Sequence, residues 1–540
     1  MAPPSRRSFL KTIGGAGLYY ATPGITRAID ALGEWSALPA DLVQISILHT
    51  TDLHGHILPT TDYAGNPDLG GFARCATQIR RWQRENRNSV LIDAGDVYQG
   101  TEVSLQTKGT VMIDLFNHFK FDAWIVGNHE FDWGVEIFMN ALAKSAMPVL
   151  AANMSVEGNP VGAVTTGPFL NLRPYILREF DGIKLAIIGV TTPGMPFWFR
   201  SEFIRGLEFK HSVEPVRRAI SNAKREGADA IVLAGHMGLK SRGDGDDFAN
   251  NVMALTSEFP DIAAFIAGHT HQLIPRRLAN GVLLTQANHF GIHIGRVDLT
   301  FDRASKKLLH REARCELMDH RVGLNRVVLS RTKPFLDESA DALAQPIGIL
   351  KETLRFRGRP GEPSEIEQLI GIAIIEELQQ RHVHVDGVLH GVFREKDFGA
   401  GPKTVSDIWD LIPFENYVVT AELRPEEIKA MMEEVYASRE PRSLIGFDIQ
   451  IEGGAAERRI TMIRLADGRP LERDQRYPVA FNSFDSRSGG HRFMQLRTLL
   501  ETTATRCVFH PVLTRDAMIS YFLRHQVVPK TAALRRPAAA

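Results

Sequence analysis

Short apolar runs alternate with amphipathic stretches along the first half of the chain. A continuous apolar run bounded by turn residues is typical of a strand buried on both faces of a sheet. We expect such strands at residues 45–48, 89–93, 123–126, 184–190, 230–235 and 264–267. We expect helices at residues 72–87, 111–116 and 135–142, where apolar side chains recur at helical spacing. Alternating strands and helices predict a layered α/β fold.

The polar residues that follow most of these runs are of types that bind metals. Four runs lead through a glycine to an aspartate, asparagine or histidine, and the first leads to its polar residues without the glycine. In open α/β sheets, ligands bind beyond the carboxyl ends of the strands. The candidate ligands at these five strand ends are Asp52, His54, Asp96, Asn128, His236, His269 and His271.

This set of residues favours a pair of hard or borderline cations. It offers oxygen and nitrogen atoms and no thiol, which suits Mn²⁺, Zn²⁺ or Mg²⁺ rather than a thiolate-bound structural zinc. Seven ligands exceed the needs of one tetrahedral site. If one carboxylate bridges, they fit a two-metal site for displacement at phosphorus. His129 can move a proton, and Asp132 can hold its ring in one orientation.

Five motifs in this order resemble those of the calcineurin-like metallophosphoesterases. They are Asp52-x-His54, Gly95-Asp96, the string from Gly127 to Glu130, Gly235-His236 and Gly268-His269-x-His271. The longer strings at residues 51–56 and 127–134 are similar to the 5′-nucleotidase branch of that family. The match covers roughly residues 43–300 and implies a four-layer metallophosphoesterase sandwich.

The resemblance also implies a role for each candidate residue. It gives one metal to Asp52, His54 and His271, the other metal to Asn128, His236 and His269, and the bridge to Asp96. His129 and Asp132 would be the catalytic pair.

A second α/β pattern extends over about residues 346–525. Ser364 is a suitable N-cap for an amphipathic helix that reaches residue 380. The strings at residues 391–394, 413–416 and 482–490 resemble the C-terminal domain of the 5′-nucleotidases, where such motifs build the nucleotide pocket. The resemblance implies a smaller α/β substrate domain with substrate-binding residues Arg394, Phe414, Asn416 and Phe484.

The chemistry of these side chains is consistent with that role. The guanidinium fork of Arg394 can bind a phosphate or a carboxylate. Phe414 and Phe484 can sandwich a planar base, at about 1–3 kcal/mol for each stacked base. The alternative is that both phenylalanines pack in the core of the domain.

The second domain also departs from the family pattern. Phe393 replaces isoleucine, Glu415 replaces glycine, and His491 stands where the family has the aspartate of the pocket. The segment from Phe484 to Gly489 holds one additional residue. The metal-binding motifs are therefore intact, whereas the substrate pocket is altered.

Composition narrows the range of partners. Equal counts of 63 basic and 63 acidic residues provide no overall field that would attract DNA or RNA, so we expect no polymeric nucleic acid as a partner. The three cysteines are far apart in the sequence and show no metal-binding or paired spacing. Cys315 and Cys507 could bridge the domains, but we favour buried free thiols.

The N-terminus indicates export. Residues 5–11, Ser-Arg-Arg-Ser-Phe-Leu-Lys, match the twin-arginine signal, and the glycine-containing stretch at 13–20 is too short for a stable membrane span. We expect the twin-arginine export machinery as a partner and a periplasmic or otherwise exported protein in a bacterium. A basic N-terminus on a cytosolic protein is the alternative.

With 540 residues, two or three domains are expected. We place a signal and leader at residues 1–40, a metallophosphoesterase domain at 43–325, a linker helix at 326–345, a substrate domain at 346–525 and a disordered tail at 526–540.

Three functions compete at this stage. The first is a two-metal hydrolase of small phosphoesters, either a 5′-nucleotidase or a 2′,3′-cyclic-nucleotide phosphodiesterase. The second is a thiosulfohydrolase of periplasmic sulfur oxidation, whose protein-bound substrate would explain a remodelled base pocket. The third is a non-catalytic binding protein on the same fold, which the intact set of seven candidate ligands argues against.

Overall fold

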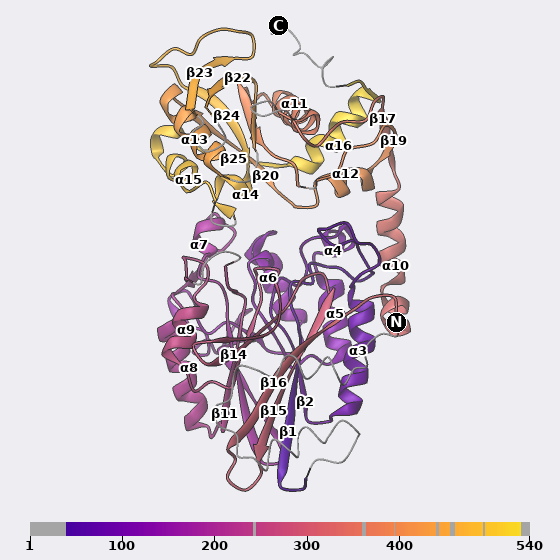
Figure 1. Cartoon of the computed structure of the whole chain (residues 1–540), viewed down its shortest axis with the longest axis vertical. Helices are drawn as coiled ribbons and strands as arrows, with labels where there is room; N and C mark the ends of the chain where they lie inside the picture. Colours follow the sequence, from indigo (N-terminus) through magenta and orange to yellow (C-terminus); the bar gives the residue numbers. More distant parts are fainter. Residues whose placement is uncertain are drawn as a thin grey trace, which may run out of the picture.

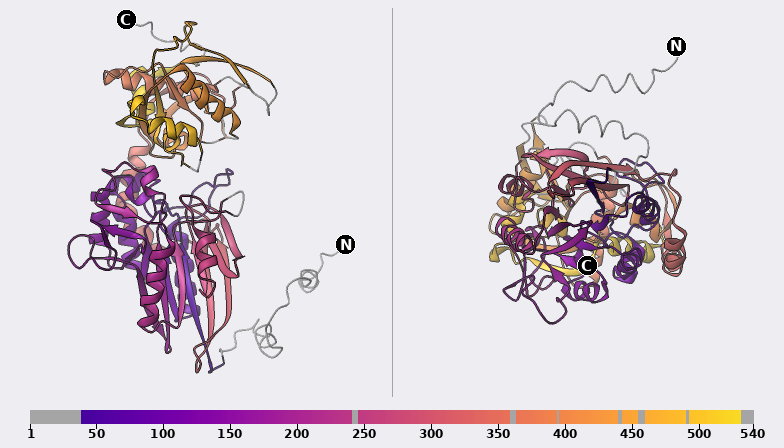
Figure 2. Two further views of the ribbon diagram at one scale, coloured as in Figure 1. Left: turned by 90° about the vertical axis from the view of Figure 1, so that its left-hand side faces the viewer. Right: turned by 90° about the horizontal axis from the view of Figure 1, so that it is seen from below.

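The computed structural model describes residues 39–240, 245–358, 363–393, 395–438, 442–453, 459–489 and 492–530. Two bodies are joined along one side by the helix α10 (Arg326–Leu343) (Figure 1). The C-terminal body is stacked on one end of the N-terminal body (Figure 2). The expected export motif, Arg394 and His491 lie outside the described residues.

The first sheet of the N-terminal body has seven strands in the order β16–β15–β1–β2–β3–β4–β7. The strands β1 to β4 run parallel to one another, and β15 pairs antiparallel with β1. The bounds are β1 (Leu42–Thr50), β2 (Ser89–Asp93), β3 (Ala123–Ile125), β4 (Val149–Leu150), β7 (Leu172–Arg173), β15 (His293–Asp302) and β16 (Leu308–Leu317).

The second sheet has six strands in the order β13–β14–β12–β11–β9–β8. Its four central strands are parallel. The bounds are β8 (Tyr175–Phe180), β9 (Ile183–Val190), β11 (Ala230–Gly235), β12 (Ala264–Ala267), β13 (Leu273–Ala279) and β14 (Val282–Ala287). Parallel strands covered on both faces need apolar side chains at every position, which explains the continuous apolar runs in the sequence.

The two sheets pack face to face and are covered by helices on their outer faces. Ile47 and Val90 of the first sheet share one core with Leu185 and Val232 of the second. The helices α3 (Phe72–Glu85), α5 (Thr110–Phe119) and α6 (Val135–Lys144) cover the first sheet, and α8 (Val213–Arg225) and α9 (Val252–Glu258) cover the second. The expected four-layer sandwich is thereby confirmed.

The C-terminal body contains a five-stranded sheet in the order β21–β18–β24–β20–β25, a three-stranded sheet in the order β19–β17–β26, and the hairpin β22–β23. Its strands are β17 (Pro346–Leu350), β18 (Gly387–His390), β19 (Gly401–Thr404), β20 (Tyr417–Leu423), β21 (Ser443–Ile445), β22 (Phe447–Glu452), β23 (Arg459–Leu465), β24 (Tyr477–Asn482), β25 (Val508–Leu513) and β26 (Val527–Val528). Its main helices are α11 (Glu365–Gln380), α12 (Val405–Leu411), α13 (Pro425–Ala437), α15 (Met494–Leu500) and α16 (Thr514–His525). Ser364 caps α11 as expected, in a capping box with Glu367.

Several short elements complete the chain. They are α4 (Glu102–Thr107), η1 (His129–Phe131), β5 (Met154–Val156), β6 (Asn159–Pro160), α7 (Met195–Trp198), β10 (Leu207–Phe209), α14 (Ser483–Ser486) and η3 (Thr503–Thr505). Among the described residues, no helix combines the length and the apolar character that crossing a membrane requires.

Two expectations need correction. The disordered tail expected at residues 526–540 begins too early, because Val527 and Val528 form β26, which pairs with β17 and extends the C-terminal body. All three cysteines are free thiols, yet only Cys75 is fully buried and Cys507 is exposed. The expectation of free thiols is confirmed, but the expectation that they are buried is wrong for Cys507.

Candidate functional site

The candidate ligands lie just beyond the carboxyl ends of the parallel strands. Five of them have the left-handed backbone conformation that non-glycine residues rarely adopt, with φ between 48° and 70°; these are Asp52, His54, Asp96, His269 and His271. Such backbone strain persists only where the surrounding structure enforces it, and it is concentrated at functional sites.

The first cluster consists of Asp52, His54 and His271, whose potential ligand atoms all lie within 4.8 Å of one another. The Nε2 atoms of His54 and His271 are 3.1 Å apart. Asp52 Oδ1 lies 3.4 Å from His271 Nε2, and Asp52 also accepts hydrogen bonds from the hydroxyl of Thr51 and the backbone N–H of His269. These bonds fix the carboxylate in place.

The second cluster consists of Asp96, His236 and His269. His236 Nε2 lies 3.0 Å from Asp96 Oδ2 and 3.1 Å from Asn128 Oδ1, so Asn128 belongs to the same group. Asp96 Oδ2 is also 3.8 Å from His54 Nε2 of the first cluster. Asp96 therefore faces both clusters.

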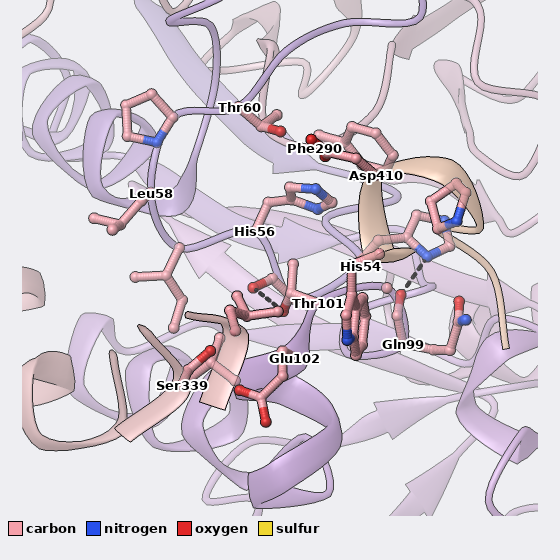
Figure 3. Close-up of a pocket in the computed structure, with 18 of the residues that line it drawn as sticks. His54, His56, Leu58, Thr60, Gln99, Thr101, Glu102, Phe290, Ser339 and Asp410 are labelled. Atoms are coloured by element: carbon pink, nitrogen blue, oxygen red, sulfur yellow. Dashed lines mark hydrogen bonds between the residues drawn. The ribbon is translucent and has the colours of Figure 1, made fainter. Parts of the chain in front are cut away.

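The hydrogen bonds of two histidines leave their Nε2 atoms suited to binding a cation. The Nδ1–H of His54 donates to the carbonyl oxygen of Gln99 at 2.7 Å (Figure 3), and that of His236 donates to the carbonyl oxygen of Ala94 at 2.8 Å. In the neutral imidazole, Nε2 then carries a lone pair that points at other acceptors or lone pairs. A metal ion at Nε2 would satisfy this arrangement. Metal-binding histidines are commonly oriented in this way, by a backbone carbonyl that accepts from the other ring nitrogen.

The buried site shifts the protonation equilibria of its ligands. Burial acts to lower the pKa of His236, but the carboxylate of Asp96 outweighs it and raises that pKa to about 9, so without a metal this ring carries a proton that a cation would displace. Burial lowers the pKa of His269 to about 4 and that of His54 well below its ordinary value, so both rings are neutral at pH 7. Burial acts to raise the pKa of Asp96, but the surrounding histidines outweigh it and hold that pKa well below the usual range. Deprotonated ligands are the forms that metals bind.

His129 and Asp132 form a close pair beside the clusters. Asp132 Oδ2 accepts from His129 Nδ1 at 2.6 Å, and the backbone N–H of His129 donates to Asp96 Oδ1 at 2.8 Å. Burial lowers the pKa of His129, but the carboxylates of Asp132 and Asp96 outweigh it and raise it to about 10. The side chain is 32% exposed, so the ring can hold a proton where a substrate can reach it.

Glu130 is a buried residue to which the sequence analysis assigned no role. Its carboxylate accepts the backbone N–H groups of Asp96, Val97 and Gly127 at 3.1, 2.7 and 2.6 Å. It thereby ties the loop after β2 to the loop after β3. In the sequence, the only signal that marks Glu130 is its place within the motif at residues 127–130.

We expect Glu130→Ala to lower the free energy of unfolding by about 3 kcal/mol, because three buried N–H groups lose their acceptor. Urea unfolding of the metal-free protein measures this loss. The matched control is Glu136→Ala, whose side chain is 61% exposed and pairs with Arg205 at the surface. The control should stay within about 0.5 kcal/mol of wild type, and equal losses in the two variants would contradict the role of Glu130.

A cavity of about 290 Å³ lies between the first cluster and the C-terminal body. His54, Gln99, Glu102 and Phe290 line it from the N-terminal body, and Asp410 lines it from the other (Figure 3). A second cavity of about 60 Å³ lies beside Asp132 and is also lined by both bodies.

The expected substrate-binding residues are not all brought together. Phe414 lines the larger cavity, with its ring 5.5 Å from that of Phe393. Asn416 is buried and its backbone carbonyl accepts from Thr514. Phe484 is 38% exposed, lies beneath the guanidinium of Arg492, and lines neither cavity.

Two further aromatic residues at the cavity were missed in the sequence. Tyr63 lines the cavity and its hydroxyl lies 3.0 Å from His271 Nδ1. Trp409 of α12 lines the opposite side. No local sequence signal marks either residue: Tyr63 lies in the loop that follows the Asp52–His54 motif, and Trp409 comes from the other body.

Comparison with known families agrees with this geometry. Residues 45–273 match the family model described as calcineurin-like phosphoesterase, which makes the N-terminal body a metallophosphoesterase domain. Residues 346–498 match the model of the 5′-nucleotidase C-terminal domain. The chain therefore combines a calcineurin-like phosphoesterase domain with a 5′-nucleotidase C-terminal domain.

Curated relatives match the chain in part. A protein of Bacillus subtilis named endonuclease YhcR is 25% identical over 501 residues, which cover 86% of this chain and 39% of the relative. The 2′,3′-cyclic-nucleotide 2′-phosphodiesterase/3′-nucleotidase of Haemophilus influenzae is 28% identical over 253 residues, which cover 44% of this chain and 37% of the relative. The chain thus spans less than two thirds of the length of either relative.

Solved structures share the fold over both bodies. A putative 5′-nucleotidase from Staphylococcus aureus has a TM-score of 0.75 at 19% identity, covering 90% of this chain and 100% of that chain. A sulfate thiohydrolase from Thermus thermophilus has a TM-score of 0.64 at 18% identity, covering 93% of this chain and 97% of that chain. At these identities the likeness establishes the fold and leaves the substrate open.

Proposed function

We propose that the protein is a two-metal phosphoester hydrolase that acts on nucleotides, as a 5′-nucleotidase or a 2′,3′-cyclic-nucleotide phosphodiesterase. The observation that carries the proposal is the pair of ligand clusters that share Asp96 beside the His129–Asp132 pair. The arrangement favours a hydrolase over a binding protein, because it sets a ring that can carry a proton beside groups suited to two cations, as phosphoester hydrolysis requires.

The ligand assignment follows from the two clusters. Asp52, His54 and His271 would hold one ion, Asn128, His236 and His269 the other, and Asp96 would bridge them. The bound ions, Mn²⁺, Zn²⁺ or Mg²⁺, would supply Lewis-acid activation of water and of the phosphoryl oxygens.

His129 would act on the leaving group. Its ring is held by Asp132 at 2.6 Å through Nδ1, which leaves Nε2 to donate a hydrogen bond or a proton to the departing oxygen. The same N–H would stabilise negative charge on the phosphoryl group in the transition state. Asp132 keeps this nitrogen protonated by raising the basicity of the ring.

The size and lining of the larger cavity support a nucleoside as the group it would bind. Small-molecule sites commonly have about 300–1,000 Å³ and apolar walls with a few polar groups, and this cavity of about 290 Å³ has aromatic walls. A thiosulfohydrolase, the second candidate, would need a groove that admits a segment of another protein. Hydrolysis of nucleotides is also supported by the names of the curated relatives.

Phe414 would stack on the nucleobase. We expect Phe414→Ala to raise KM for AMP roughly ten- to hundredfold, because a stacked base contributes about 1–3 kcal/mol. Phe484→Ala is the matched control, since Phe484 lines neither cavity, and it should leave KM unchanged. Steady-state kinetics on both variants decide the matter: a rise in KM for Phe484→Ala alone would place the base elsewhere.

The twin-arginine motif at residues 5–11 supports export of the folded, metal-loaded protein by the twin-arginine machinery to the periplasm or beyond. Fusion of residues 1–40 to a reporter that folds before export tests this point. Replacement of Arg6 and Arg7 by lysine should retain the reporter in the cytoplasm.

A hydrolysis screen with added Mn²⁺ tests the function itself. The panel contains AMP, UMP, 2′,3′-cyclic AMP, ribose 5-phosphate, a single-stranded DNA oligonucleotide and a cysteine thiosulfonate peptide. We expect phosphate release from AMP or ring opening of the cyclic nucleotide. Turnover of the thiosulfonate peptide alone would favour the second candidate, and cleavage of the oligonucleotide alone would indicate a nuclease.

A further inference from the structure

One hydrogen bond connects the two bodies next to the catalytic pair. The indole Nε1–H of Trp133 donates to Glu415 Oε2 at 2.5 Å, and Glu415 is only 8% exposed. Trp133 directly follows Asp132 in the sequence. Glu415 stands where the resembling family has glycine, so this link depends on a side chain that the family pattern lacks.

Trp133 is held firmly within the N-terminal body. Its ring stacks on that of Tyr98 at 5.4 Å, with 16° between the ring planes, and the Lys108 ammonium lies 5.0 Å from its centre. The hydroxyl of Tyr98 donates to the backbone carbonyl of Glu130 in the turn η1. The position of the indole is therefore coupled to the position of the turn that bears His129.

Within the C-terminal body, Glu415 lies beside a buried cation. Its Oε1 lies 3.6 Å from Nη2 of Arg515, and both side chains are almost completely buried. The Arg515 guanidinium lies 3.3 Å from the centre of the Trp409 ring, which lines the larger cavity. Glu415 thus stands between the catalytic turn and the wall of the cavity.

We propose that Glu415 is a positioning residue that fixes the C-terminal body relative to the catalytic turn through its hydrogen bond to Trp133. The burial of a charged carboxylate is unfavourable unless it is paired, and its partners here come from both bodies. The link therefore favours one relative placement of the bodies. The consequence for nucleotides rests on the proposed function, since only a substrate that contacts both bodies depends on their placement.

Trp133→Phe is the variant that tests the link. It removes the indole N–H and keeps an aromatic ring to stack on Tyr98. We expect small-angle X-ray scattering to show a broader distribution of distances between the bodies, and KM for AMP to rise roughly tenfold with kcat within about threefold. Hydrolysis of ribose 5-phosphate, which has no base to contact the C-terminal body, should stay within about twofold.

Two further variants separate this role from a general loss of stability. Trp124→Phe removes an indole N–H bond of 3.2 Å to Ser145 within the N-terminal body and should leave the scattering unchanged. Glu415→Gln retains an oxygen that accepts from Trp133, so it should keep KM closer to wild type than Glu415→Gly does.

Wild-type scattering and KM in Trp133→Phe would overturn the proposal, as would equal losses in Glu415→Gln and Glu415→Gly. If wild type hydrolyses no nucleotide, the proposed function fails, and the scattering of Trp133→Phe still decides whether the link exists.

Discussion

Asp96→Asn is expected to lose both metal ions and to lower phosphoester hydrolysis by roughly 10³-fold or more, because each cation contributes several kcal/mol to the transition state. Asp96 Oδ2 lies 3.0 Å from His236 and 3.8 Å from His54, so its negative charge serves both clusters. Asparagine retains an oxygen that can accept from the backbone N–H of His129, so we expect the fold to be preserved. Elemental analysis after dialysis counts the metal ions that remain.

His54→Ala is the control for the bridging role. His54 belongs to the first cluster, and its loss should remove one equivalent of metal and leave the second in place. If Asp96→Asn retains two equivalents, Asp96 is not the bridge. If His54→Ala also loses both ions, the two sites are not separately assembled, and the assignment of ligands to two clusters is wrong.

His129→Asn should keep both metals and lower kcat for AMP by about 10²–10⁴-fold, the usual range for loss of a general acid or base. The ring bonds to Asp132 through Nδ1, and its centre lies 5.1 Å from that of the His54 ring. The hydrogen bond of His129 to Asp96 comes from its backbone N–H, which the variant retains. The variant therefore removes a group that acts on the leaving oxygen and leaves the ions in place.

The leaving group provides the control for this variant. A 4-nitrophenyl ester departs without protonation, so its hydrolysis by His129→Asn should fall much less than that of AMP. Equal losses for the two substrates would indicate a role in binding phosphate instead. Normal turnover of AMP would remove His129 from the mechanism.

The strand ends of the metal site were predictable from the sequence for a physical reason. Strands buried on both faces must be apolar throughout, so the polar residues after 92, 126 and 235 stand out against them. The division of the ligands between two clusters, by contrast, came from the family resemblance. Residue types alone did not indicate which strand ends would meet.

The region between the two bodies could not be predicted in the same way. Trp133 and Glu415 are 282 residues apart, and their hydrogen bond depends on how two separately folded bodies dock. Phe484 stands in a motif that resembles the nucleotide pocket, yet it lies beneath Arg492 and outside the cavities. Side-chain placement at an interface follows from packing, which a local motif does not specify.

The central claim is that the two-metal site hydrolyses nucleotides. A comparison of kcat/KM between nucleotides and a sugar phosphate tests it most directly. The measurement is kcat/KM for AMP, for 2′,3′-cyclic AMP and for ribose 5-phosphate on the wild-type protein loaded with Mn²⁺. Stacking of about 1–3 kcal/mol predicts that one of the two nucleotides is hydrolysed at least about fivefold more efficiently than the sugar phosphate. Equal values for all three, or no hydrolysis by protein that holds two metal ions, would contradict the claim.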